Sequence, residues 1–417
     1  MHLLLCAAGT VGDVHPLLAV AVAMRSRGHR VTLLANAAYE TVAREAGAEF
    51  APVGRAEDLE RLQNDPLGWT YSLGGRMWLQ HGGVEPMREL YAAIRERHEP
   101  GSTVVAASYL AFGARVAQDH LGIPTATLNL NAHTIRTLYD ILSMPPPMVV
   151  GKWVGRWFVR VEYWIADRYW IDPLVLPELN AFRHELGLPA VSRVMNGWLH
   201  SPQLAIGLFP DWWCARQSDW SPQVELTGFP FWDRSDTVPV SAALNEFLDA
   251  GSPPILFTPG ASGLHTRDYF AAACGACEQL GRRGLLITRR TDVLPAALPA
   301  FMRSASYVPF RKVLPRMAAV VHHAGIGTTA LCLEAGVPQL VLPTIYNQPD
   351  TACRLERLGV ARQLHPRTLS SARMATSLNE LLSSPDIAGR CRDVASRFRG
   401  VDPMPRVCEL LESLLGQ

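Results

Sequence analysis

The chain has 417 residues, of which 48% are hydrophobic and 18% charged, and this length suits two domains of roughly 200 residues each. The 39 basic and 38 acidic side chains leave a formal net charge of +1, which excludes the strong positive field that nucleic-acid binding requires. No secretion signal is recognised and no apolar run reaches the roughly 18 residues of a membrane span. We therefore expect a cytoplasmic protein whose partners are small molecules.

The first half of the chain alternates strand-like apolar runs with amphipathic segments. The predicted elements are a strand over 2–8, a helix over 16–27, a strand over 31–36, a helix over 38–46, and strands over 104–108 and 124–130. Such alternation is typical of a parallel sheet with helices on both faces. The first half is therefore interpreted as a Rossmann-like domain, over residues 1–228.

Residues 144–170 differ from the rest of the chain because prolines, aromatic side chains and arginines are mixed there. The aromatic and basic members are Trp153, Trp157, Phe158, Tyr163, Trp164, Tyr169 and Trp170 with Arg156, Arg160 and Arg168. One interpretation is a helix whose apolar face packs on the first domain. The alternatives are that 145–170 lines a pocket for an apolar ligand, or that it forms a surface that touches a membrane with the arginines near lipid phosphates. The sequence leaves these alternatives open.

The alternation of strand-like and helical segments stops in the segment GFPFWDRSDTVPV over 228–240, which is interpreted as a linker. A second series then follows, with strands over 255–259, 285–288, 306–308, 319–323 and 339–343 and helices over 266–281, 327–335 and 349–358. The predicted fold class is thus α/β, with two Rossmann-like parallel-sheet domains facing a central cleft. The second domain is placed at 229–400, and residues 401–417 are predicted to form a C-terminal helix near the interdomain region.

The strongest local pattern is VVHHAGIGTTALCLEAGVP over 320–338, where a strand runs into glycines at the start of a helix. Backbone N–H groups and the positive end of the helix dipole converge on an anion in this arrangement. His323 and Thr328 add side-chain donors, and Gly325 and Gly327 let an anion approach the backbone. The pattern predicts a diphosphate site, although a tight turn that needs glycine is the alternative. A second glycine loop, TPGASG over 258–263, follows another strand and is predicted to face the same anion.

The N-terminal loop AAGTVGDVHP over 7–16 has the same strand-to-helix form, with Pro16 predicted in the first turn of the helix. Asp13 and His15 are the groups there that can take a proton. Because Asp13 would repel a phosphate, we assign this loop to a neutral group that is activated. The alternative is that Asp13 only caps the helix.

No metal site is predicted. The pair Cys274 and Cys277 forms a CxxC inside a helical pattern, without a second pair of cysteines or histidines nearby. Packing is therefore the preferred interpretation over zinc or redox use. A carboxylate pair of the DxD type is also absent from the sequence.

The glycine loop with GDVHP, RGHRVTLL over 27–34, and the block over 307–361 together resemble the family 1 nucleotide-sugar glycosyltransferases of GT-B fold. The resemblance covers nearly the whole chain. Residues 200–233 further resemble the segment before the linker in the rhamnosyltransferases of rhamnolipid synthesis.

The resemblance implies site residues position by position. Tyr307 would stack on a thymine or uracil and the backbone of Val308 would bind the edge of the base. The diphosphate would lie against His323, Gly325, Gly327 and Thr328, with Gly260 and Ser262 opposite. The sugar hydroxyls would be bound by Asn347 and Gln348, where the family usually has Asp-Gln. Asp13 would be the catalytic base, and His15 would line the pocket or assist the proton's exit. Ala324 stands where a glycine is more usual.

The activity implied is inverting, metal-independent transfer of a hexose from a dTDP or UDP sugar, with no cofactor. The preferred donor is dTDP-rhamnose and the preferred acceptor a 3-(3-hydroxyalkanoyloxy)alkanoate. The alternative within the class is a polyketide, sterol or other natural-product aglycone. Alternatives outside the glycosyltransferase class are a nucleotide-sugar epimerase, a dinucleotide oxidoreductase and a subunit that only binds its ligand. Peripheral association with the inner membrane surface or with an acyl-handling partner protein is a further alternative.

Overall fold

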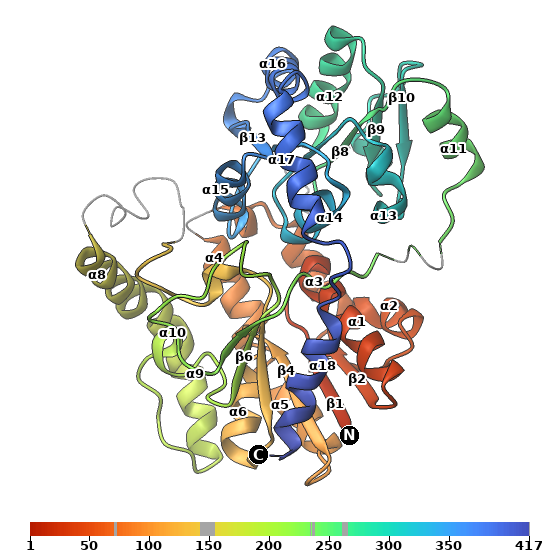
Figure 1. Ribbon diagram of the computed structural model, residues 1–417. Coiled ribbons are helices and arrows are strands. Elements are labelled where there is room, and N and C mark those ends of the chain that lie inside the picture. The colour runs from red at the N-terminus through yellow and green to blue at the C-terminus, as the bar shows by residue number, and fades with distance from the viewer. Residues whose placement is uncertain (71–72, 142–154, 234, 236–237, 261–265, 417) are drawn as a thin grey trace. The chain divides into compact units, whose positions relative to one another are not determined.

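The structure is a computed structural model that describes all residues except 71–72, 142–154, 234, 236–237, 261–265 and 417. The chain divides into two compact units (Figure 1). Unit 1 contains Met1–Phe231 and Asp402–Gln417, and unit 2 contains Trp232–Val401. The chain therefore leaves unit 1 once and returns to it with the C-terminal helix.

Unit 1 is built on a parallel sheet whose described strands number seven and run in the order β3-β2-β1-β4-β5-β6-β7. Their bounds are β1 His2–Cys6, β2 Arg30–Ala35, β3 Glu49–Pro52, β4 Thr103–Ser108, β5 Thr125–Asn129, β6 Leu204–Gly207 and β7 Val224–Leu226. Every residue of β1, β4 and β5 is buried, as expected where helices cover both faces. The order reverses between β1 and β4, so the loops after these strands lie at the position where such sheets bind ligands.

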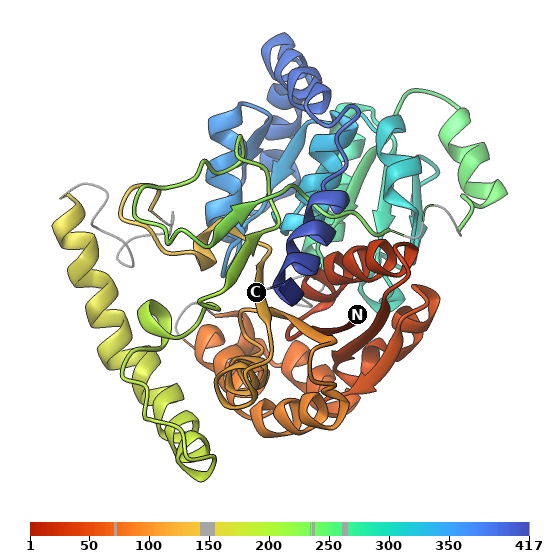
Figure 2. The same ribbon diagram turned by 60° about the horizontal axis from the view of Figure 1, so that its bottom comes forward.

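Most helices of unit 1 lie between successive strands of the sheet, whereas α18 is the C-terminal helix that returns to this unit (Figures 1 and 2). They are α1 Val11–Ser26, α2 Glu40–Glu45, α3 Ala56–Asn64, α4 Gly74–Met77, α5 Met87–Arg97, α6 Phe112–Leu121, α8 Arg156–Ala166, α9 Asp172–Glu185, α10 Val194–Gly197 and α18 Met404–Glu412. The π-helical turns η3 Trp78–Val84 and η5 Asp167–Ile171 extend α4 and join α8 to α9. Figure 2 shows α8 and α9 as one long rod at the left of the view.

Helix α1 begins earlier than the sequence pattern indicated. It starts at Val11, so Pro16 lies inside the helix and not in its first turn. The early start has a local cause, since the backbone N–H of Thr10 and the carboxylate of Asp13 form half of a capping box. Pro16 has no N–H to donate to the carbonyl of Gly12, and the helix continues past it because its other bonds remain.

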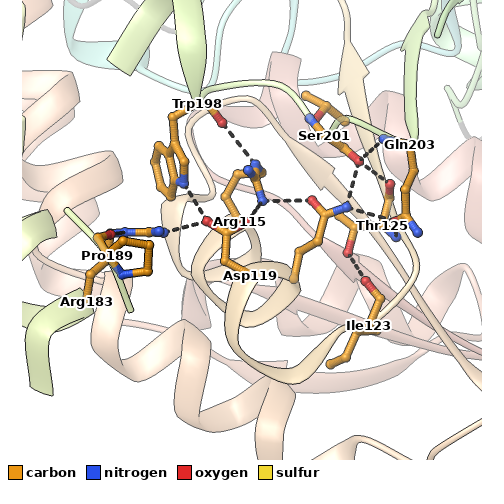
Figure 3. A network of polar contacts seen from close by, with 11 residues as sticks. Arg115, Asp119, Ile123, Thr125, Arg183, Pro189, Trp198, Ser201 and Gln203 are labelled. Carbon is orange, nitrogen blue, oxygen red and sulfur yellow. Dashed lines mark hydrogen bonds and ion pairs between the residues drawn. The ribbon is translucent and has the colours of Figure 1, made fainter. Parts of the chain in front are cut away.

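A network of polar side chains fixes the segment that leads from α9 into β6 (Figure 3). Asp119 at the end of α6 binds Arg115 and Arg183, each at 2.5 Å, and accepts a 2.8 Å hydrogen bond from the indole of Trp198. Beside it, the Gln118 amide donates to Ser201 and Gln203 at 2.9 and 2.8 Å. These bonds hold the chain at the start of β6 against α6.

Unit 2 is a second parallel sheet, in which the described strands number six and run in the order β10-β9-β8-β11-β12-β13. The strands are β8 Ile255–Thr258, β9 Gly284–Ile287, β10 Met302–Ala305, β11 Ala319–His322, β12 Gln339–Val341 and β13 Ala361–Gln363. The helices are α11 Ala242–Asp249, α12 Thr266–Leu280, α13 Phe310–Val313, α14 Ile326–Ala335, α15 Gln348–Leu358, α16 Ser371–Leu382 and α17 Pro385–Ser396. The predicted α/β class with two Rossmann-like domains is confirmed.

One predicted strand in unit 2 is wrong. Residues 306–308 form no strand, and the edge strand is Met302–Ala305, which pairs with β9. Ser306 is exposed and Pro309 offers no N–H for a ladder. The Val308 side chain instead packs in the hydrophobic core of unit 2, where it is 3% exposed. The segment is therefore a loop that leads into α13.

Candidate active site

The loop after β1 places Asp13 beside the switch point of unit 1. Oδ2 of Asp13 accepts the backbone N–H of Thr10 at 2.7 Å and the Thr10 hydroxyl at 3.1 Å. Gly9 has φ +125°, and a Cβ at Gly9 would lie 2.3 Å from that same oxygen. Glycine is therefore required at this position, both for the backbone and for the carboxylate. Oδ1 accepts no hydrogen bond from the residues that the structure describes.

The surroundings of Asp13 make its carboxyl group a stronger base than usual. Burial raises the pKa of Asp13 to about 6, although the two hydrogen bonds from Thr10 act in the opposite direction. The buried Tyr39 lies close by, and its hydroxyl donates to the Gly9 carbonyl at 3.3 Å. Burial and the Asp13 charge both raise the pKa of Tyr39 and of Tyr109. Asp13 thus caps the helix, and it also holds a carboxylate oxygen in an environment that favours uptake of a proton.

His15 is half-buried two residues further along α1. Positions i and i+2 of a helix do not share a face. The two side chains therefore leave the helix in different directions.

A cavity of about 500 Å³ opens beside the β1 loop in unit 1. Its walls come from the ends of β1, β2 and β3, from α3, η3 and α5, and from the start of α6. The apolar lining includes Leu34, Val53, Leu62, Met77, Trp78, Leu90, Leu110 and Phe112, and the ionisable lining consists of Asp58, Arg61, Asp65, His81, Glu85 and Glu89. Gly9 also lines this cavity, so the cavity reaches the glycine that lies against the Asp13 carboxylate. Trp78 is 8% exposed, and its indole N–H has no partner among the described residues. Trp78 lies on the π-helical turn η3 outside any motif, so no sequence pattern singles it out.

In unit 2, the loops after β8 and β11 meet because these two strands pair at the sheet's switch point. Thr258 is the register partner of His322, so Gly260 and His323 follow on neighbouring strands. A Cβ at Gly260 would lie 2.2 Å from Cε1 of His323, and one at Gly325 would lie 2.4 Å from its Nε2. The imidazole of His323 therefore fills the space that two glycines leave open. Burial lowers the pKa of His323 to about 4, so its ring is neutral near pH 7.

His322 has a different task from its neighbour. It is fully buried, its Nε2 lies 2.9 Å from Oε1 of Gln339, and its Nδ1 accepts the backbone N–H of Ala324 at 3.2 Å. Ala324 has φ +65°, the left-handed conformation that glycine adopts more easily. The turn is thus formed with alanine, and the hydrogen bond to His322 holds it.

Helix α14 begins directly after this turn. Its N-cap is Gly325, which has no side chain to cap the helix, and the first intrahelical bond is donated by Thr329. Gly327 is exposed and no described atom lies within 4 Å of a Cβ placed on it. Among the described residues nothing accepts the N–H groups of residues 326–328, which point out of the helix end. His323, Gly325, Gly327 and Thr328 are therefore brought together with Gly260, whereas Ser262 lies outside the described residues.

The loop after β10 holds Tyr307 and Val308. The Tyr307 hydroxyl donates to the backbone carbonyl of Asp233, and the Asp233 carboxylate accepts the backbone N–H of Arg311 at 2.8 Å. Asp233, which the sequence analysis did not select, therefore ties the start of unit 2 to this loop. Tyr307 is half-buried.

Asn347 and Gln348 lie at the N-terminus of α15. Oε1 of Gln348 accepts the N–H and the hydroxyl of Thr344 at 2.8 and 2.7 Å, and the N–H of Ile345 at 3.3 Å. These bonds fix the orientation of the amide. The Gln348 carbonyl thus closes its own loop, and the amide NH2 is the part of this side chain that remains for a ligand. Asn347 is the half-buried N-cap residue.

No cluster of three or more metal-ligating side chains occurs among the residues that the structure describes. Cys277 is buried in α12, and burial raises the pKa of its thiol to about 12. Cys274 on the same helix is partly exposed. This placement agrees with the packing interpretation of the pair.

Comparison with known proteins decides the class of enzyme. Residues 3–134 match the glycosyltransferase family 28 N-terminal domain, and residues 285–413 match the C-terminal domain of erythromycin biosynthesis protein CIII-like proteins. The O-mycaminosyltylonolide 6-deoxyallosyltransferase of Streptomyces fradiae is 27% identical over 99% of this chain and 97% of its own length. The chain is a glycosyltransferase.

Solved structures show the same fold for this glycosyltransferase. The glycotransferase of kitacinnamycin superposes with a TM-score of 0.75 at 22% identity, over 99% of each chain. The glycosyltransferase VinC, solved in complex with dTDP, superposes with a TM-score of 0.72 at 16% identity, over 100% of each chain. The GT-B expectation is confirmed. None of these three relatives is a rhamnosyltransferase of rhamnolipid synthesis, so that finer part of the expectation stays a prediction.

Proposed function

We propose that this glycosyltransferase transfers a sugar, with inversion, from a dTDP or UDP sugar to a hydroxyl group of an apolar acceptor. The observation that carries the proposal is a half-buried carboxylate of raised pKa, held against Gly9, which itself lines a cavity with many apolar side chains. A carboxylate in this state suits the removal of a proton from a neutral hydroxyl group near pH 7.

In the proposed reaction, Oδ1 of Asp13 takes the proton of the acceptor hydroxyl. The hydroxyl oxygen forms a bond to the anomeric carbon while the bond from that carbon to the diphosphate oxygen breaks. The proton ends on Asp13 and the electron pair leaves with the nucleoside diphosphate. Attack from the side opposite the diphosphate inverts the configuration of the sugar.

The charge that develops on the diphosphate is assigned to the N-terminus of α14. The uncapped N–H groups of residues 326–328 and the helix dipole favour an anion there. The neutral imidazole of His323, which occupies the space beside Gly260 and Gly325, and the hydroxyl of Thr328 add donors. Since these donors are fixed before the reaction, they stabilise the leaving group without reorganisation. The scheme assigns no step to a metal.

The remaining contacts are assigned to the loops of unit 2. Tyr307 would stack on the base, the backbone of Val308 would bind the base edge, and Ser262 would face the phosphates. Asn347 and the amide NH2 of Gln348 would bind sugar hydroxyls. Because an asparagine both donates and accepts where a carboxylate only accepts, the sugar that fits here is expected to present an acceptor oxygen at this position.

The acceptor is assigned to the apolar cavity of unit 1. The indole N–H of Trp78 would donate to an oxygen of the acceptor, since a buried donor without a partner costs about 1–3 kcal/mol. An apolar molecule that carries at least one carbonyl or hydroxyl oxygen satisfies both the lining and this donor. His15 would line the same region or assist the exit of the proton.

Trp78→Phe is expected to weaken binding of the acceptor selectively. The change removes one hydrogen bond, so the acceptor KM should rise about 3- to 10-fold, while the donor KM stays unchanged. Trp220→Phe is the matched control, because the Trp220 indole is also buried in unit 1 but donates to the carbonyl of Ile135 at 3.2 Å. An equal rise in the acceptor KM for both variants would contradict the assignment.

The pH dependence of the rate is expected to follow Asp13. Only the charged carboxylate takes a proton, so kcat/KM should rise with pH and level off above an apparent pKa near the value of about 6. The Thr10 hydroxyl donates to the charged form and lowers this pKa. Thr10→Val should therefore move the rise to higher pH, whereas Thr10→Ser should leave it in place. A rise that Thr10→Val does not move would assign it to another group.

The resemblance and the relatives support different acceptors. Residues 200–233 support dTDP-rhamnose as donor and a 3-(3-hydroxyalkanoyloxy)alkanoate as acceptor, which would place the enzyme near a membrane or an acyl-handling partner. The relative from Streptomyces fradiae supports a natural-product aglycone as acceptor, and the dTDP complex of VinC supports a dTDP-linked donor.

The test is release of nucleoside diphosphate from a panel of dTDP and UDP sugars, with hydroxyacyl acceptors, with apolar aglycones and without acceptor. We expect release only when an apolar hydroxylated acceptor is present, and product with inverted anomeric configuration. The same panel in the presence of a chelator is expected to give unchanged rates. Release that does not depend on any acceptor, or retention of configuration, would overturn the proposal.

A further inference from the structure

The first part of the long α8–α9 helix presents aromatic side chains to solvent. The exposed fraction is 74% for Trp157, 50% for Trp164, 61% for Tyr169 and 57% for Trp170. Among the residues whose exposure the structure describes, Trp157, Trp164 and Trp170 are the exposed tryptophans. Burying an aromatic side chain is strongly favourable, so this concentration on one helix indicates a surface that is covered in use. The interpretation that this whole face packs on the first domain is therefore wrong for these rings.

The exposed rings form a continuous stripe. Trp157 and Trp164 are seven residues apart, so they share one face of the helix. The Trp164 and Tyr169 rings then meet edge to face at 6.1 Å across the π-helical turn η5. Beyond that turn the helix changes character, because Val175 and Leu179 of α9 are fully buried in the core of unit 1. One half of the rod is thus anchored in the protein while the other half carries the stripe.

The helix segment that carries the stripe contains more arginines than acidic residues. Residues 156–171 contain three arginines and two acidic residues, and one of the acids, Asp167, is buried against Arg136 at 2.7 Å. A cavity of about 530 Å³ lies beside the stripe, with Trp164, Val161 and Leu138 among its apolar lining. Arg160 and Arg193 also line it.

Two carboxylates, those of Asp219 and Asp167, accept hydrogen bonds from residues that line this cavity. The Asp219 carboxylate accepts the Thr137 hydroxyl and the Leu138 N–H, each at 2.7 Å, and Asp167 accepts Asn196 as well as Arg136. Burial raises the pKa of Asp167, and the charges of Arg136 and Arg193 act in the opposite direction. Within the described residues neither Arg160 nor Arg193 forms an ion pair, and the carboxylate near Arg193 is already paired with Arg136. Two exposed guanidinium groups thus line the same cavity as the exposed Trp164 ring, without a carboxylate paired to either.

We propose that the α8 surface, formed by Trp157, Arg160, Trp164, Tyr169 and Arg193, docks on the negatively charged face of a lipid bilayer. Tryptophan and tyrosine rings enter the headgroup region, where one side is apolar and the other wet. The guanidinium groups of Arg160 and Arg193 bind the phosphates of anionic lipids, which supply the missing negative charge. No helix among the described residues is long and apolar enough to span a bilayer, so the docking is peripheral.

A bilayer explains the arrangement better than a soluble ligand. A small anion in the cavity would neutralise Arg160 and Arg193, but the cavity lining does not include Trp157, Tyr169 or Trp170. A lipid surface covers the whole stripe and the two arginines at once. The inference does not depend on the proposed acceptor or donor.

The test is co-sedimentation of the full-length protein with vesicles of phosphatidylcholine alone and of phosphatidylcholine mixed with phosphatidylglycerol. We expect binding to the mixed vesicles, little binding to phosphatidylcholine alone, and a loss of binding as salt is raised. Arg160→Gln with Arg193→Gln should weaken the partition coefficient about 30-fold, and Trp157→Ala with Trp164→Ala at least as much.

The matched control is Arg373→Gln with Arg392→Gln, which removes the same charge from exposed arginines of unit 2. This double variant should bind as the wild type does. Thermal unfolding of each variant shows whether the fold is retained. The proposal is overturned if the wild type does not bind mixed vesicles at low salt, or if the control loses as much affinity as Arg160→Gln with Arg193→Gln. Loss of nucleotide release in solution would concern the proposed function, not this surface.

Discussion

Asp13→Asn is expected to lower kcat about 10²- to 10⁴-fold, the usual contribution of a general base, while dTDP still binds. The substitution separates the two tasks of this side chain. An amide oxygen at position 13 can still accept the N–H of Thr10, which the carboxylate does at 2.7 Å, so the start of α1 is retained. The amide cannot take the proton of the acceptor. The measurements are initial rates, dTDP binding by calorimetry and the melting temperature.

Two controls accompany this variant. Asp13→Ala loses the base and the cap together, so it should be as inactive as Asp13→Asn but also less stable by about 1 kcal/mol. Glu40→Gln changes an exposed carboxylate in the first turn of α2, the next helix of unit 1, and should leave the rate unchanged. Full turnover in Asp13→Asn would show that another group accepts the proton.

His323→Ala is expected to weaken dTDP binding and to lower kcat/KM about 10²- to 10³-fold, the typical effect of losing one preorganised donor. Its melting temperature should change little, because Nδ1 of His323 has no partner among the described residues and the ring fits against glycines. The measurements are calorimetry with dTDP, initial rates and thermal unfolding.

The adjacent histidine provides the contrast. His322→Ala removes a fully buried ring that bonds Gln339 and the Ala324 N–H, so it should lower stability by about 2–5 kcal/mol. If His323→Ala destabilises the protein as much as His322→Ala does, and dTDP affinity is unchanged, His323 has a packing role only.

The sequence predicted those parts of the fold where the local pattern and the tertiary structure agree. The predicted strands that became β1, β2, β4, β5, β8, β9, β11 and β12 are rich in apolar residues, and every residue in them except Arg30 is buried, because both faces of a parallel sheet are covered. The strands β3, β6, β7 and β13 were missed, since each has only three or four residues. The edge strands β3, β7 and β13 also contain exposed or half-exposed side chains. Short edge strands are defined by pairing, and pairing is not visible in a single segment.

The candidate site was predictable where glycines mark it. Gly260 and Gly325 were selected for anion approach, and the structure adds a reason that no sequence shows, namely that the His323 ring needs the space of both Cβ atoms. Conversely, Trp78 and Asp233 matter through cavities and contacts made by distant segments. Their neighbours in the sequence carry no motif, so only the fold brings them to the site.

The sequence pattern of residues 156–170 did not predict which side chains of this helix are buried and which are exposed. A helix was predicted and α8 is a helix, yet the sequence left its face undecided between packing, pocket and membrane. Val159 is fully buried whereas Trp157 is 74% exposed, so the aromatic residues do not follow the packing stripe. The burial of Val159 and the ion pair of Asp167 with Arg136 are tertiary contacts with distant segments, which the local pattern does not contain.

The return of the chain to unit 1 determines how parts of this enzyme can be exchanged. Helix α18 is held by Glu412, which binds Arg27 at 2.7 Å and His29 at 2.7 Å on the turn after α1. These bonds lower the pKa of Glu412 to about 2. A chimera that takes everything after residue 231 from a relative would replace α18 with a foreign helix and lose this anchor. Exchanging only residues 232–401, with one junction at each end, replaces unit 2 and leaves α18 in contact with Arg27 and His29 of unit 1.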